Sequence, residues 1–234
     1  MSFSMRHMRF QWVVGKGMQK LSRVEYNTDS LQRLVRSVTF FKDIVKVDSE
    51  QFDLLLSVSE FVEAKAGETV LQKGNQDKTL YFLLKGQMSV YCEDEGESLN
   101  LINPGEVFGA LSMVTGRGRS ATVKAQTDVI LLGIDFKYFQ DIEDFSLFTI
   151  QTKLIAYRMM LHNIRWNLEV NKMQNPTHEL NKRLLKLPIY KGEKGGKEEL
   201  LALSEQSRLL ADLLCEWNDV HNVQRINLMT QVNH

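Results

Sequence analysis

The sequence predicts an α+β fold in which a roll of short β-strands lies between helical segments. Apolar runs of strand length alternate with Gly67, Gly74, Gly86, Gly96 and Gly105, and segments with helical spacing stand on both sides of this region. Glycine suits the corners of such a roll because several tight turns need a positive φ. This pattern is typical of closed or double-sheet β folds of the jelly-roll type.

The predicted N-terminal region, residues 1–38, is a basic arm followed by a helix. Residues 1–36 carry seven Lys or Arg against Glu25 and Asp29. Residues 29–38 have apolar side chains on one helical face, and Asp29 or Ser30 is the expected cap. The arm is expected to fold back on the acidic body or to contact an anionic partner.

The predicted β-roll spans residues 39–136. Phe40–Ile44 is expected to end in a turn, and a second helix begins near Asp48. Residues 61–74 then read as two short strands around a turn, residues 79–91 as two more, and residues 129–134 as the strand that closes the roll, with Asp135 as the cap of the next helix.

A glycine-rich stretch inside the roll, residues 108–125, has the features of an anion cradle. A tight turn at Gly109 and a short helix leave backbone N–H groups unpaired and pointing outward, with a partial positive charge at the helix start. The Arg119 guanidinium and the Ser120 hydroxyl follow the loop at 116–118 and complete the cradle. A phosphate is the ligand that such donors favour.

These residues resemble the phosphate-binding cassette of the cyclic-nucleotide-binding domain, which occurs in catabolite activator/FNR regulators and in regulatory subunits of cyclic-AMP-dependent kinase. The resemblance lies in Phe108-Gly109, Leu111 and Arg119-Ser120-Ala121, and it extends over residues 40–140 through Ala-Gly-Glu-Thr-Val, Leu-Tyr-Phe-Leu-Leu-Lys-Gly and Asn-Pro-Gly-Glu-Val-Phe. It implies the β-roll and the following ligand-binding residues: Phe108, Gly109, Ala110, Leu111, Ser112, Arg119 and Ser120.

Position 110 departs from the family pattern, in which a glutamate accepts a hydrogen bond from the ribose 2′-hydroxyl. Here the residue is Ala110. Loss of a charge-assisted hydrogen bond costs about 1.5–3 kcal/mol. Three consequences remain open: weak binding of cyclic AMP or cyclic GMP, binding of another anion such as a cyclic dinucleotide, or a vestigial pocket that binds nothing.

A long helix is predicted within residues 137–174, because leucine recurs every seven residues from Leu147. Positions d are Leu147, Leu154, Leu161 and Leu168, and positions a are Ile150, Tyr157, Ile164 and Asn171. We expect a parallel homodimer through Leu154, Leu161, Ile164 and Leu168, in keeping with the helix that forms the dimer axis and covers the ligand in the family. The alternative is that this seam packs on its own β-roll.

Residues 175–234 are predicted to form a C-terminal helical module. Asn175 and Pro176 read as the cap and first residue of a helix, and a final helical section follows from Glu198. Residues 209–214 and 223–226 are faintly similar to the helix-turn-helix of activator-type relatives. However, the segment between them is too long for the usual turn, and eight basic residues are balanced by eight acidic ones. We therefore favour a protein partner here over DNA.

The composition narrows the class of protein. Hydrophobic residues make up 43% and charged residues 25%, with zero net charge, as in an ordinary soluble domain. Cys92 and Cys215 lie far apart, which predicts free thiols in a reducing cytoplasm. No apolar run approaches the roughly 20 residues of a membrane span. The histidines show no metal-ligand spacing, and no catalytic motif or cofactor-binding motif occurs.

The sequence thus predicts a non-enzymatic cytoplasmic sensor or regulator. In this hypothesis, an anionic nucleotide bound by the cassette shifts the helix that follows the roll and thereby the C-terminal module. One alternative is a ligand-independent interaction scaffold that keeps the roll as a platform. A further alternative is a DNA-binding transcriptional regulator.

Overall fold

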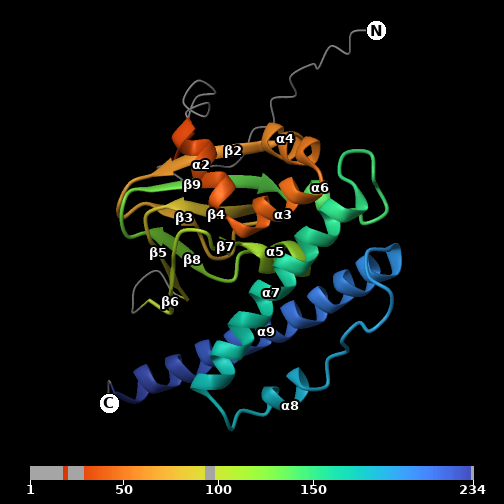
Figure 1. Ribbon diagram of the computed structural model, residues 1–234. Coiled ribbons are helices and arrows are strands. Elements are labelled where there is room, and N and C mark those ends of the chain that lie inside the picture. The colour runs from red at the N-terminus through yellow and green to blue at the C-terminus, as the bar shows by residue number, and fades with distance from the viewer. Residues whose placement is uncertain (1–17, 21–28, 93–97, 233–234) are drawn as a thin grey trace.

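The computed structural model describes residues 18–20, 29–92 and 98–232, with side chains in the last stretch as far as Asp219. Two antiparallel sheets form the roll (Figure 1). One has the order β1-β2-β9-β4-β7, with bounds Gln19–Lys20, Ser59–Ala64, Val129–Asp135, Thr79–Lys85 and Val107–Phe108. The other has the order β3-β8-β5-β6, with bounds Thr69–Leu71, Thr122–Ala125, Met88–Tyr91 and Asn100–Ile102. This architecture confirms the predicted fold class.

The alternation of side chains along the central strands creates two cores. In β9, Val129 and Leu131 point into the roll and join a cluster with Val62 and Met88, whereas Leu132 and Ile134 point outward to the helices. Gly133 lies between them, where an added Cβ would meet the Tyr81 ring at 3.0 Å. The outer face of this sheet therefore needs a helical cover.

Three helices supply part of that cover: α2 at Asp29–Ser37, α3 at Thr39–Val47 and α4 at Ser49–Ser57 (Figure 1). The Asp48 carboxylate caps α4 by accepting hydrogen bonds from the backbone N–H groups of Glu50 and Gln51. The prediction that Phe40–Ile44 ends in a turn was wrong. These residues lie inside α3, because Phe40 and Phe41 pack on Phe82 with ring centroids 5.0 and 4.8 Å away.

After β9, the chain forms a short helix, α6 at Lys137–Gln140, and then the long helix α7 at Ile150–Gln174. The Asp135 carboxylate accepts a hydrogen bond from the N–H of Lys137 at 2.9 Å. The loop between α6 and α7 is fixed by Lys153, whose buried ammonium donates to the carbonyls of Asp141 and Asp144. Burial lowers the pKa of Lys153.

The last helix, α9 at Lys197–Val232, runs alongside α7 in the same direction (Figure 1). Near the start of both helices Arg158 pairs with Glu199, and farther along Ile164 and Leu168 share an apolar cluster with Leu210. The buried side chains of α9 have heptad spacing of their own: Leu200, Leu203, Ser207, Leu210, Leu214 and Trp217. The parallel partner of α7 is therefore a helix of the same chain.

This pairing changes the interpretation of the α7 seam. Leu154, Ile164 and Leu168 are at most 2% exposed within the single chain, and Leu161 is half-buried. These side chains are covered by the chain's own elements, so a second copy would reach them only after α9 had moved. The homodimer itself stays a prediction.

Residues 175–196 carry the chain from the end of α7 back to the start of α9, with the short helix α8 at Leu180–Leu184 on the way. Asn175 closes α7 instead of capping the next helix, and its carbonyl accepts a hydrogen bond from the Asn181 side chain. Residues 209–226 lie within the continuous helix α9, so the turn of a helix-turn-helix is absent from this described stretch. Among the described helices, none is both long and apolar enough to cross a bilayer.

Candidate functional site

The glycine-rich stretch forms a closed loop between the two sheets. β7 ends at Phe108, Gly109 turns the chain with φ +88°, and the short helix α5 follows at Ala110–Thr115. An L side chain would be strained at Gly109, and an added Cβ there would lie 2.6 Å from the Nη1 atom of Arg119. Glycine is thus required both by the turn and by the guanidinium packed against it.

Arg119 is the centre of this loop, with only 3% of its surface exposed. Its Nε and Nη2 atoms donate to the two carboxylate oxygens of Asp77, the Nε contact being 2.9 Å long. Nη2 also donates to the Thr79 carbonyl at 2.6 Å, and Nη1 donates to the Gly109 carbonyl at 2.7 Å and to the Ser112 hydroxyl at 2.9 Å. A guanidinium has five N–H donors, so every donor of Arg119 has a protein acceptor.

The backbone of the loop is fixed to the neighbouring turn at residues 74–75. The N–H of Gly74 donates to the Arg119 carbonyl, and the N–H of Arg119 donates to the Asn75 carbonyl, both at 2.8 Å. Gly118 lies so close to this turn that an added Cβ would meet the Gly74 carbonyl oxygen at 2.7 Å. Arg119 is therefore held in place from both its backbone and its side chain.

The structure brings three of the predicted site residues together, namely Gly109, Ser112 and Arg119. Phe108 is buried in the roll, where its ring stacks on Tyr81 at 5.5 Å between centroids. Burial raises the pKa of Tyr81 to about 12. Leu111 is half-buried against the C-terminal helices, and Ser120 is half-buried beside Arg119 in the loop.

Ala110 occupies an apolar position. It is 3% exposed and belongs to the cluster that also contains Leu80, Val107 and Met113. A carboxylate at this position would lack the polar surroundings that stabilise a charge. The missing acidic group is thus matched by an apolar local environment.

Sequence reasoning missed the two residues that complete the loop, Asp77 and Thr79. They lie about forty positions before Arg119 and reach it only because β4 begins next to the cassette. Asp77 stands in a polar turn between two strands, where a lone carboxylate gives no periodic signal. The pairing of Asp77 with Arg119 could have been predicted only by asking which carboxylate neutralises a buried arginine.

Helix α9 is the second structure in contact with the cassette. Leu111 and Val114 of α5 pack against an apolar cluster that includes Leu210, Leu214 and Trp217. Beyond α5, the Arg117 guanidinium lies 4.0 Å from the Asp212 carboxylate. Helix α7 also touches the site, since the Asn163 amide donates to the Val107 carbonyl at 3.1 Å.

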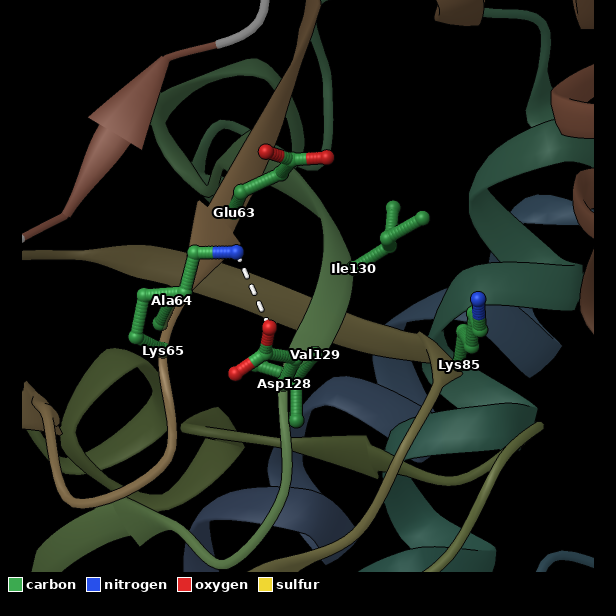
Figure 2. A pocket seen from close by; sticks show the side chains of 7 residues that line it. All are labelled: Glu63, Ala64, Lys65, Lys85, Asp128, Val129 and Ile130. Carbon is green, nitrogen blue, oxygen red and sulfur yellow. Dashed lines mark hydrogen bonds and ion pairs between the residues drawn. The ribbon is translucent and has the colours of Figure 1, made fainter.

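A cavity of about 200 Å³ lies elsewhere, at the ends of β2, β4 and β9 (Figure 2). Figure 2 shows the Lys65 side chain joined to Asp128 by an ion pair, with Lys85 apart from them. The Lys65 ammonium is 2.9 Å from the Asp128 carboxylate, and this contact lowers the pKa of Asp128. The Lys65 and Asp128 side chains are 69% and 63% exposed and neutralise each other, so this pair lacks the burial of a built ligand site.

Metal ligation has no support in the described part of the chain, where no three His, Cys, Asp or Glu side chains are grouped to hold an ion. Both cysteines are free and buried. Burial raises the pKa of the Cys215 thiol, which keeps it protonated and unreactive.

Residues 61–144 match the model of the protein family described as the cyclic nucleotide-binding domain. This range contains most of the roll and the whole cassette. Among solved structures, a cyclic nucleotide-binding domain from Methylobacillus flagellatus KT is 15% identical and superposes with a TM-score of 0.53, covering 74% of this chain and 91% of that one. This likeness supports the fold.

Two further structures are similar at lower TM-scores. One, described as Sp-2Cl-cAMPS bound to PKAR CBD2, is 19% identical with a TM-score of 0.42, covering 51% of this chain and 79% of that one. The other is the sensor domain of the transcriptional regulator DNR from Pseudomonas aeruginosa, at 21% identity and a TM-score of 0.40, covering 63% of this chain and 94% of that one.

Proposed function

We propose that the protein is a non-enzymatic sensor that binds an anionic nucleotide and passes the binding event to its C-terminal helices, and the match of residues 61–144 to the cyclic nucleotide-binding domain supports this proposal. The candidate ligands are cyclic AMP or cyclic GMP, bound weakly, and a cyclic dinucleotide. The ligand would occupy the cassette formed by α5, Arg119 and Ser120.

The observation that carries this proposal is the position of Arg119. Its guanidinium, which is paired with Asp77, reaches across the loop to the Gly109 carbonyl and the Ser112 hydroxyl, so a buried guanidinium lies beside the first turn of α5. The N–H groups of that turn and this guanidinium are arranged before any ligand arrives, which reduces the ordering cost of capturing a phosphate. The direct contact between α5 and α9 supplies a route to the C-terminal helices.

The apolar surroundings of Ala110 shape the expected ligand preference. A ribose 2′-hydroxyl near this residue would lose its hydrogen bonds to water and gain no acceptor from the side chain. Cyclic AMP and cyclic GMP should therefore bind with roughly ten- to a hundredfold lower affinity than to a site with a carboxylate there. A cyclic dinucleotide, whose recognition can rest on its two phosphates, loses less.

A specific observation also favours a second candidate function, the ligand-independent scaffold. All five Arg119 donors already have protein acceptors, and Asp77 already balances its charge. In this alternative, Arg119 is a structural ion pair that ties β4 to the cassette. The domain would then serve as a platform for the helices, and an anion would have to break one of these bonds to enter.

Calorimetric titration separates the two functions. The full chain is titrated with cyclic AMP, cyclic GMP and cyclic di-GMP, and its melting temperature is measured with and without each nucleotide. Heat from one of them and a raised melting temperature support the sensor, since a ligand that binds only the folded state stabilises it. Absence of heat from all three, with an unchanged melting temperature, favours the scaffold.

Substitution of Ser120 by Ala then tests the position of the ligand. If the hydroxyl contacts the anion, affinity falls by about tenfold. The melting temperature of the unliganded variant serves as the control for the fold. Unchanged affinity for a nucleotide that binds the wild-type chain would place that nucleotide outside the proposed cradle.

A further inference from the structure

Arg117 is the second cation of the cassette loop, and it differs from Arg119 in its exposure and in its hydrogen-bond partners. The Arg119 side chain is 2% exposed and all of its donors are used, whereas the Arg117 side chain is 58% exposed. Only Gly118 separates them on the same loop. Arg117 is therefore the cassette guanidinium that can change partners without disturbing the buried core.

The present partner of Arg117 lies on α9. Its Nη2 atom is 4.0 Å from a carboxylate oxygen of Asp212, and the Cys215 thiol is close enough for the guanidinium to act on its pKa. Asp212 has a second cation, since its other oxygen is 3.7 Å from Arg208 on the same helix. Asp212 therefore keeps a paired charge when Arg117 leaves.

The same junction contains an apolar contact. Leu111 and Val114 of α5 belong to the cluster formed with Leu210 and Leu214 of α9. The cassette helix and α9 are thus joined by one weak ion pair and a few apolar side chains. A small displacement of α5 or of its loop acts directly on α9.

We propose that an anionic ligand in the cassette draws Arg117 away from Asp212, and that this exchange loosens α9 from the cassette helix. The proposal rests on the proposed sensor function and names the ion pair that ligand binding would break. A pair at 4.0 Å between exposed side chains contributes little free energy, whereas a guanidinium bound to a phosphate makes short charge-assisted hydrogen bonds. The ligand therefore outcompetes the carboxylate, and α9 becomes the element that reports occupancy.

The chain offers a matched control pair on the same helix. Arg183 of α8 and Glu216 of α9 form an ion pair whose side chains are 57% and 45% exposed, compared with 58% and 42% for Arg117 and Asp212. Arg183 lies outside the cassette. Substitutions of this pair remove the same charges from the same region and leave the cassette loop unchanged.

The experiment measures affinity in five variants of the full chain, for whichever of cyclic AMP, cyclic GMP and cyclic di-GMP binds the wild type. Arg117→Gln should weaken binding by about tenfold, because one phosphate contact is lost. Asp212→Asn should tighten binding by about two- to fivefold, because the competitor for Arg117 is removed. Asp212→Asn added to Arg117→Gln should have no further effect, and the controls Arg183→Gln and Glu216→Gln should bind like the wild type.

Hydrogen exchange of the α9 amides supplies the second readout. Saturating nucleotide should speed exchange in residues 205–217 of the wild type, and it should not do so in Arg117→Gln. If a nucleotide binds and both Arg117→Gln and Asp212→Asn keep the wild-type affinity, or α9 exchange is unchanged by ligand, the switch is wrong and the sensor function stands. If none of the three nucleotides binds, the sensor function and its switch are both overturned.

Discussion

Replacement of Arg119 by Met is the most severe test of the cassette as described. The substitution leaves the Asp77 carboxylate, two backbone carbonyls and a buried hydroxyl without their donor. Removing one partner of a buried ion pair costs about 3–5 kcal/mol, a large part of the 5–15 kcal/mol that stabilises a typical domain. For a chain of this size, the melting temperature should fall by roughly 6–20 °C.

Urea unfolding followed by circular dichroism measures this loss, and Arg117→Met is the control. Arg117 lies in the same loop but is mostly exposed, so its variant should change the free energy of unfolding by less than about 0.5 kcal/mol. The double variant Arg119→Met with Asp77→Asn should be less damaged than the sum of the single variants, since neither charge is left unpaired. A loss below about 1 kcal/mol in Arg119→Met, or equal losses in the two arginine variants, would refute the buried-pair account.

Three other substitutions have expected outcomes that stability measurements check. Ala110→Glu should destabilise the chain by more than about 2 kcal/mol. The loss of stability should grow as pH rises above about 4.3, because burial favours the protonated carboxyl over the carboxylate. The neutral variant Ala110→Gln should lack this pH dependence. Burial raises the pKa of Glu199, but hydrogen bonds from Arg158 and Gly195 outweigh it and hold the pKa below its usual value. Its contribution is therefore present above about pH 4.3 and lost as pH falls through the lower folded-state pKa, so Glu199→Gln should weaken neutral stability and flatten the acid decline. Ser207→Ala should stabilise by about 1 kcal/mol, because the fully buried hydroxyl has no hydrogen-bond partner among the described residues; a loss of stability would contradict this.

The sequence was a good guide wherever a local pattern determines the structure. The strands of the roll, the helix start near Asp48 and the turn at Gly109 each follow from a few neighbouring residues, and the structure has them where they were expected. The turn predicted at the end of Phe40–Ile44 was wrong because the two adjacent aromatic residues Phe40 and Phe41 show no helical periodicity. Their helix forms because both rings find the same partner on β4.

The relations between distant segments could not be predicted in this way. The heptad of α7 led us to expect a second copy as its partner, and that homodimer stays a prediction. The repeat alone could not distinguish such a copy from α9, whose own heptad is interrupted by Ser207. Asp77 is similar, because its pairing with Arg119 depends on how two sheets meet. In both cases the sequence shows that a side chain or a helix face needs a partner, and the three-dimensional arrangement decides which residues supply it.

The shared direction of α7 and α9 has a consequence for how the chain is made. Because residues 175–196 must lead back before α9 can begin, the apolar side of α7 is synthesised well before its cover. At ribosomal rates of about 5–20 residues per second, Leu168 waits roughly 2–10 s for Trp217 to emerge. During that interval Ile164 and Leu168 of α7 lack the α9 side chains that cover them in the folded chain.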